Sequence, residues 1–135
     1  MNLDRTKNLL LNIAEDISYP VRNYRLAAAV MFKNQIVSVG VNSQKTDPFQ
    51  TKYMKNPFSI YIHAEVSAVK NALKRIDLDD FKKSSLIVVR IKRNETNTAF
   101  IPAMAKPCMG CMSCISEFGV KHIHFTNEEG KLVQL

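Results

Sequence analysis

The segment Pro107-Cys108-Met109-Gly110-Cys111, taken with the upstream triplet His63-Ala64-Glu65, decides how this chain is interpreted. Two cysteines three positions apart can hold one zinc ion from a single short turn. A histidine as the third protein ligand leaves the fourth position of tetrahedral zinc open to water, which distinguishes catalytic from structural zinc sites. A glutamate two residues further on can then move protons beside the metal. The two segments together predict one catalytic zinc centre.

Each of these residues also has an ordinary structural explanation. Cys108 and Cys111 could be buried thiols, and His63 could be a polar residue at a helix start. The helix dipole could favour Glu65 in the first turn, since an acidic side chain there stabilises a helix by about 0.3–1 kcal/mol. This explanation is compatible with a catalytic role. A Cys-x-x-Cys pair alone is weak evidence. Its combination with Pro107 and with His-x-Glu favours zinc ligation by His63, Cys108 and Cys111.

The pattern H-x-E followed by P-C-x-x-C is a signature of zinc nucleobase deaminases, and the chain resembles the cytidine and deoxycytidylate deaminase superfamily. The resemblance implies hydrolytic deamination of a cytosine base in a nucleoside or nucleotide (cytidine, deoxycytidine or dCMP), giving the uracil product and ammonia. In that chemistry zinc lowers the pKa of its bound water to about 7. Glu65 accepts the proton while zinc-bound hydroxide attacks C4, and then protonates N3 and the leaving ammonia.

The resemblance also suggests contacts with the substrate. Asn42 ends a predicted strand at the place where many superfamily members hold a sugar hydroxyl, although an asparagine there also suits a turn. Ala64 matches the position whose backbone amide binds the base carbonyl. No phosphate-binding motif is present, and the nearest cations for a phosphate are Lys45, Lys52 and Lys55.

Hydrophobic periodicity and turn residues divide the chain into elements. We expect helices at 4–19, 62–75 and 108–118, and strands at 26–32, 36–41, 86–91, 120–125 and 132–135. The first two strands should form a hairpin. The polar segment 43–59 is expected to be a long loop, either covering the substrate or forming a surface insertion. Residues 77–83 are expected to be a charged turn.

Strand–helix–strand alternation predicts an α/β domain. Helices 62–75 and 108–118 would be successive crossovers in parallel βαβ units, so that their N-termini meet at one sheet edge. The resemblance implies a three-layer cytidine-deaminase-like fold, with a mixed central sheet of about five strands and residues 1–135 as one catalytic domain. Only ten residues follow Phe125, so the last two strands should be antiparallel, as in the nucleoside (cytidine and blasticidin-type) branch.

The remaining cysteine and histidines carry weaker signals. Cys114 continues the cysteine run, but an iron–sulfur motif needs a fourth cysteine, and we favour a packed thiol. His122 and His124 share one face of a predicted strand. Histidines at a sheet edge or an interface explain that pattern better than a second metal site does.

The composition limits the kinds of partner and cellular location that this chain is expected to have. The chain has 135 residues, a net charge of +7 and three cysteines. An odd cysteine count argues against a disulfide framework and favours a cytoplasmic location. No apolar run suits a signal peptide or a membrane span. Residues 70–93 carry eight basic and three acidic side chains, which indicates either a solvated surface or attraction to phosphate.

We therefore expect a small-molecule substrate, a Zn²⁺ cofactor and, from the resemblance, a homo-oligomer. Two other classes stay open. A deaminase of single-stranded DNA or RNA would need a basic, aromatic track leading to the zinc. A non-catalytic structural zinc module would need no general acid–base, so Glu65 argues against it.

Overall fold

A six-stranded mixed sheet forms the centre of the computed structural model, which describes residues 3–18, 25–45, 47–53 and 62–135. The strands are β1 (Arg25–Phe32), β2 (Gln35–Val41), β3 (Ser85–Arg93), β4 (Phe100–Pro102), β5 (His122–Thr126) and β6 (Leu132–Gln134). Neighbouring strands follow the order β2-β1-β3-β5-β6. β5 pairs with the N-terminal half of β3, and β4 pairs with the C-terminal end of β3. The helices are α1 (Leu3–Glu15), α2 (Pro48–Thr51), α3 (Ala64–Ala72), α4 (Leu78–Phe81) and α5 (Met109–Phe118).

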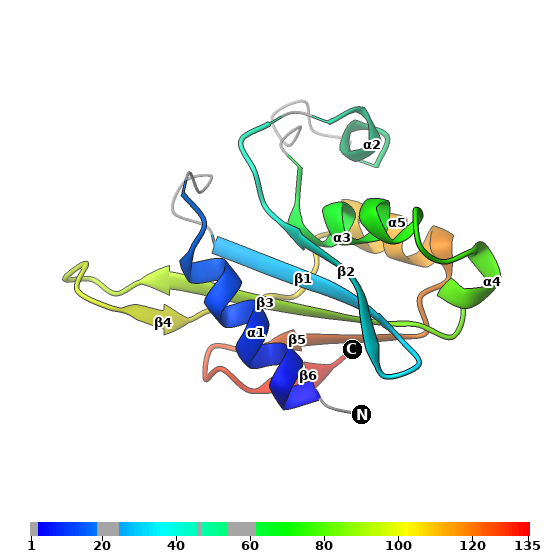
Figure 1. Cartoon of the computed structure of the whole chain (residues 1–135). Helices are drawn as coiled ribbons and strands as arrows, with labels where there is room; N and C mark the ends of the chain where they lie inside the picture. Colours follow the sequence, from blue (N-terminus) through cyan, green and yellow to red (C-terminus); the bar gives the residue numbers. More distant parts are fainter. Residues whose placement is uncertain (1–2, 19–24, 46, 54–61) are drawn as a thin grey trace.

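Helices cover both faces of the sheet, which gives three layers (Figure 1). On one face, Leu10 and Ala14 of α1 pack against alternate residues of β1 and β3. On the other face, α3 and α5 lie side by side over the intervening residues of the same strands. This arrangement explains the almost continuous aliphatic run of β3, because a strand buried on both faces has no solvent side. The predicted layers and mixed sheet are confirmed.

The strands joined by the two predicted crossovers run in the same direction, as expected, but only one of the two pairs consists of neighbouring strands. β3 and β5 are parallel neighbours joined through α5. β2 and β3 also run in the same direction, since both are antiparallel to β1, but β1 lies between them. The crossover through α3 therefore passes over one strand. Both helices still begin at the same edge of the sheet, and the final pair β5–β6 is antiparallel as expected.

Several local expectations need correction. The helix predicted at 62–75 is shorter, because α3 begins after His63 and ends before a tight turn in which the Arg75 amide bonds to Ala72. The charged turn contains α4, which a capping box between Asp77 and Asp80 stabilises. The loop 43–59 contains α2, and its residues 46 and 54–59 lie outside the described part, as does position 19 at the end of the first predicted helix. β4 was not predicted; it forms a hairpin arm with β3 (Figure 1).

Among the described residues, no helix is long and apolar enough to cross a bilayer.

Gly40 allows α3 to lie directly on β2. A Cβ atom added to Gly40 would come within 2.5 Å of the Ala64 carbonyl oxygen and closer still to the Ala68 backbone nitrogen. Two hydrogen bonds hold the same contact: Ser38 Oγ donates to Ala68 O at 2.7 Å, and Asn71 Nδ2 donates to Val39 O at 2.9 Å. The absence of a side chain at residue 40 therefore fixes the position of the helix that begins at Ala64.

We predict that Gly40→Ala lowers the free energy of unfolding by about 3 kcal/mol, the upper end for overpacking, because the new methyl group meets backbone atoms that cannot rotate away. Urea unfolding measures this loss. Ser38→Ala is the matched control on the same strand, since it removes one hydrogen bond and should cost about 1 kcal/mol. A Gly40→Ala protein as stable as wild type would contradict the close packing.

Candidate metal centre

The N-cap residues of α3 and α5 bring the predicted ligands together. His63 precedes α3 in an extended conformation, with φ −87° and ψ 154°, and Cys108 precedes α5 in a similar one, with φ −71° and ψ 171°. The Cys111 amide lies 3.4 Å from Cys108 Sγ and donates to it. Unpaired N–H groups and the positive end of the dipole at a helix start favour an ionised thiolate there.

The three donor atoms are spaced as a tetrahedral zinc ion requires. His63 Nδ1, Cys108 Sγ and Cys111 Sγ all lie within 4.8 Å of one another. Nδ1 is 3.2 Å from Cys111 Sγ and 3.7 Å from Cys108 Sγ. Zn–S bonds of about 2.3 Å and Zn–N bonds of about 2.0–2.1 Å at tetrahedral angles give N···S separations of about 3.6 Å. The donor set therefore fits zinc by distance and by chemical type.

The electrostatics of the cluster also favour a cation. A hydrogen bond with the Cys111 thiol lowers the pKa of Cys108 to about 4, while that same hydrogen bond and burial raise the pKa of Cys111. A hydrogen bond with Cys108 raises the pKa of His63. Only one of the two sulfur atoms thus ionises readily. A divalent cation removes this competition, because it stabilises both thiolates together.

Glu65 lies beside the donor cluster in the first turn of α3. Its side chain is 3% exposed, and within the described part of the chain Oε1 has no hydrogen-bond partner. Burial raises the pKa of this carboxyl group. A buried polar atom without a partner typically costs about 1–3 kcal/mol and calls for an explanation, such as a catalytic role. Glu65 is therefore a candidate for chemistry beside the donor cluster.

Of the two residues expected to contact substrate, Ala64 directly follows His63, and Asn42 is connected to the same segment through Ser43. Asn42 is buried at the end of β2, and its Oδ1 accepts a hydrogen bond from the Leu26 amide at 2.9 Å. The next residue, Ser43, donates its amide to Ile62 O at 3.1 Å, which ties the end of β2 to the chain just before His63. Ala64 is the first residue of α3, where the backbone N–H has no partner within the helix.

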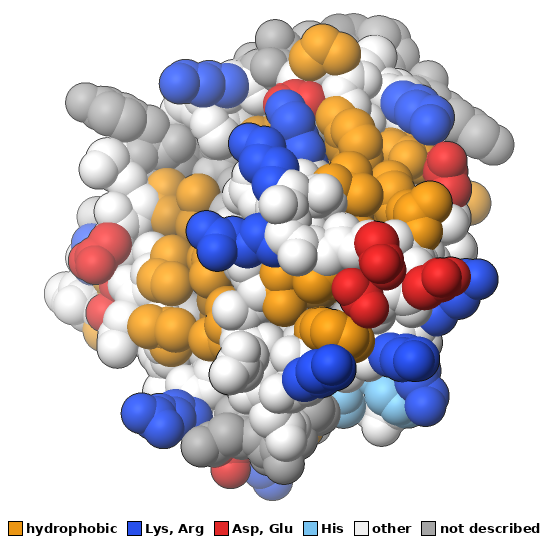
Figure 2. Space-filling model, turned by 45° about the vertical axis from the view of Figure 1, so that its right-hand side comes forward, with side chains coloured by type: hydrophobic (Ala, Val, Ile, Leu, Met, Phe, Trp, Pro, Cys, Tyr) orange, Lys and Arg blue, Asp and Glu red, His pale blue; other side chains and the backbone are white. Residues whose placement is uncertain are grey.

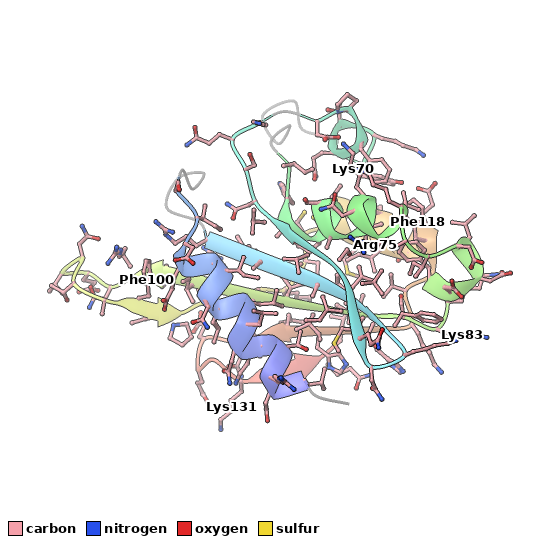
Figure 3. All side chains as sticks on the ribbon, viewed as in Figure 1. Lys70, Arg75, Lys83, Phe100, Phe118 and Lys131 are labelled. Carbon is pink, nitrogen blue, oxygen red and sulfur yellow. The ribbon has the colours of Figure 1, made fainter. Side chains whose placement is uncertain are left out.

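The short helix α2 bridges the two helices that carry the cluster. Its N-cap Asp47 accepts from the Phe49 amide at 2.8 Å and forms a 2.7 Å ion pair with Lys70 of α3. The Phe49 ring stacks on Phe118 of α5, with ring centroids 6.1 Å apart. Figure 3 shows Lys70 on α3 directly below α2, and Phe118 on α5. α2 therefore contacts both helices that carry the candidate ligands.

Sequence analysis did not single out Gln50 of α2, although this residue contacts the site directly. Gln50 is fully buried, and its Oε1 accepts a hydrogen bond from the His63 amide at 2.9 Å. Within the described residues its Nε2 has no hydrogen-bond partner. The available signal was the segment Asp47-Pro48-Phe49-Gln50, in which Asp-Pro is a helix-start pattern inside the predicted loop. That pattern does not reveal which residue the side chain contacts.

The other candidate residues do not join the cluster. Cys114 is fully buried in the core, as expected of a packed thiol. His122 accepts or donates a hydrogen bond with Gln134 at 3.0 Å, and the His122 and His124 rings are 6.4 Å apart. Lys52 pairs with Glu117 at 3.4 Å, on the surface. Lys55 lies outside the described residues.

Comparison with known proteins gives one family and a set of similar folds. The family model described as the cytidine and deoxycytidylate deaminase zinc-binding region matches residues 2–127. No sequence among curated proteins matches significantly.

Three similar crystal structures, of two proteins, illustrate the fold. The apo dCMP deaminase from cyanophage S-TIM5 is 24% identical, with a TM-score of 0.57 over 91% of this chain and 83% of that one. The cytidine deaminase from Mycobacterium leprae is 14% identical, with a TM-score of 0.58 over 99% and 93%. The cyanophage enzyme in complex with dCMP and dUMP is 19% identical, with a TM-score of 0.59 over 92% and 79%. At these identities the likeness confirms the predicted fold.

We predict that Asp47→Asn lowers the free energy of unfolding by about 0.5–1 kcal/mol at pH 7, the upper range for partly exposed ion pairs. Asparagine keeps the helix cap, so the change isolates the charge. The hydrogen bond from Lys70 lowers the pKa of Asp47 below its usual 3.8. The ion pair therefore stabilises the fold fully above that value, and its contribution is lost as the pH falls through the lower, folded-state pKa.

Urea unfolding of both proteins at a series of pH values tests this. The two unfolding free energies should converge at the acid end of the series. Lys52→Met, which removes the exposed pair with Glu117, is the control and should show no such loss at neutral pH. A difference between Asp47→Asn and wild type that does not change with pH would contradict the assignment.

Proposed function

Because this chain belongs to the cytidine and deoxycytidylate deaminase family, and is therefore a zinc-dependent deaminase, we propose that it hydrolyses the amino group of a cytosine base carried on a nucleoside or nucleotide. One observation carries the proposal. The Glu65 carboxylate is buried, its Oε1 has no hydrogen-bond partner among the described residues, and it lies two positions along the chain from a histidine that shares a donor cluster with two cysteines. A structural zinc module has no use for that carboxylate.

In this proposal His63 Nδ1, Cys108 Sγ and Cys111 Sγ hold the zinc ion. A bound zinc ion would supply Lewis acidity, which lowers the pKa of water at the metal to about 7. The distances between the donor atoms and their chemical types support this ligand set.

Glu65 moves the protons. Its Oε1 accepts one proton from the attacking water and delivers it to N3 of the ring. It then takes the second proton from the new hydroxyl group on C4 and delivers it to the departing amino group. The water oxygen becomes the C4 carbonyl of the uracil product, the C4–N bond breaks, and ammonia leaves. One carboxylate can serve all three steps because the atoms lie within a short distance of one another. Burial keeps bulk water away from this exchange.

Asn42 and Ala64 position the substrate. We assign a sugar hydroxyl to the Asn42 side chain, which the hydrogen bond from the Leu26 amide holds in one orientation. We assign the base carbonyl to the Ala64 amide at the start of α3, because the first N–H groups of a helix point outward without helical partners. Residue 62 is tied to Ser43 by a backbone hydrogen bond, so the two contacts belong to one connected segment.

We propose a small-molecule substrate rather than a polynucleotide. On the one face that Figure 2 shows, the described Lys and Arg side chains are interspersed with hydrophobic and acidic ones. Both similar deaminases are named for cytidine or dCMP. We further propose that residues 1–135 act as one catalytic domain, since both hydrophobic clusters pack on one sheet. The homo-oligomer and the cytoplasmic location stay predictions.

We predict that Glu65→Gln lowers kcat for deamination by about 10²–10⁴-fold, the range for removing a general acid–base. Zinc should remain at one ion per chain, because the three donor atoms are untouched. Ammonia release and metal content measure the two quantities in the same preparation. Glu95→Gln, a change of the same kind in the exposed turn after β3, is the control. An active Glu65→Gln enzyme would refute the proton transfer assigned to Glu65.

We predict that wild-type protein releases ammonia from at least one compound of a panel of cytosine, cytidine, deoxycytidine and dCMP, and not from a cytosine-containing single-stranded oligonucleotide. A chelator should abolish the activity, and added zinc should restore it. Activity confined to the oligonucleotide would move the function to nucleic-acid editing. Zinc bound at one ion per chain without any activity would favour a structural module.

A further inference from the structure

We propose that Gln50 is a positioning residue of the metal centre, which fixes the backbone of His63 and thereby raises the affinity of the site for zinc. The inference rests on the proposed function, because it takes His63 as a zinc ligand. It adds a residue from a segment expected to be a loop.

His63 needs an external support. It is the N-cap of α3, where the chain changes from an extended to a helical conformation. N-cap side chains usually secure this change by accepting a hydrogen bond from the helix. The His63 side chain makes no such bond, and its ring instead faces the sulfur atoms of Cys111 and Cys108. The backbone of the candidate ligand is therefore not held by its own side chain.

Gln50 provides that support. Its Oε1 accepts the His63 N–H at 2.9 Å. Neighbouring residue 62 is held independently, because the Ile62 amide donates to Lys45 O at 3.1 Å and Ile62 O accepts from Ser43. Among the described residues, Gln50 is the side chain that accepts the His63 N–H. Its hydrogen bond sets the position from which the imidazole reaches the sulfur atoms.

Gln50 belongs to a helix that is tied to both helices of the site. The ion pair between Asp47 and Lys70 connects α2 to α3, and the stacking of Phe49 on Phe118 connects it to α5. The Gln50 side chain is fully buried. A ligand whose backbone is held in place before the metal binds loses less freedom on binding, which raises affinity.

The unpaired end of Gln50 argues for the same role. Its Nε2 is buried without a partner among the described residues, which destabilises the fold. An apolar side chain of similar length would avoid that loss. The presence of an amide is therefore explained by what its oxygen does for His63, and not by a contribution to general stability.

Gln50→Met tests the proposal, since methionine keeps the length of the side chain and removes the acceptor. We expect the dissociation constant for zinc, measured by chelator competition, to rise about 10–100-fold, as for other residues that orient metal ligands. The absorption spectrum of the cobalt-substituted protein should shift, because the ligand geometry changes. Ile87→Val is the matched control. It removes a methylene group from the core on the opposite face of the sheet and should leave both readouts unchanged.

A second measurement uses the wild-type protein and so does not depend on the folding of a variant. Coupling between two binding events is reciprocal, so zinc should strengthen the Gln50–His63 hydrogen bond. Hydrogen exchange should show about tenfold or greater added protection of the His63 amide on zinc binding. The Phe49 amide, which Asp47 holds in the same helix, should gain less.

The outcomes separate this inference from the proposed function. Tight zinc binding by wild type, with a Gln50→Met affinity within about threefold and an unchanged cobalt spectrum, would overturn the role of Gln50 alone. An equal loss in Ile87→Val, or equal added protection of the His63 and Phe49 amides, would do the same. A wild-type protein that binds no zinc would overturn the proposed function, and this inference with it.

Discussion

The close approach of α3 to β2 at Gly40 is the constraint on which the site depends. A helix axis normally lies about 10 Å from a sheet, a distance that side chains set. Here the backbone of residues 64–68 lies against a residue with no side chain. This contact fixes the distance of α3 from the sheet and the point at which the helix begins. The positions of His63 and Glu65 follow from both. The partner helix α5 is fixed separately by Cys114 and Ile115 in the core.

Two helix starts at one sheet edge then create the chemistry. Each start presents N–H groups without helical partners and a partial positive charge, so thiolates and a carboxylate are favoured where they would otherwise repel one another. The remaining repulsion among Cys108, Cys111 and Glu65 is relieved by a divalent cation. The metal centre is thus a consequence of strand order, because β2, β3 and β5 all run toward the same edge.

The sequence was most informative where residue type alone determines the chemistry. His63, Glu65, Cys108 and Cys111 were predicted from their spacing; the structure brings the three predicted ligands together, and Glu65 interacts with them. The insertion of β1 between β2 and β3 was not foreseen, because a hairpin followed by a crossover is compatible with more than one strand order. β4 and α2 were missed since three or four residues carry no periodicity. The Gln50–His63 contact depends on the docking of α2, which no local pattern encodes.

The two hydrophobic clusters and the metal centre contribute differently to the stability of the fold. Both hydrophobic clusters are closely packed aliphatic layers on either face of the sheet, and they account for most of the burial. At the metal centre, two buried polar atoms lack partners among the described residues: Glu65 Oε1 and Gln50 Nε2. Each costs about 1–3 kcal/mol, a loss that natural proteins accept mainly at functional sites. The sheet with its two cores thus sustains a site that is less stable than its surroundings. Zinc, by binding only the folded arrangement of His63, Cys108 and Cys111, would return part of that stability.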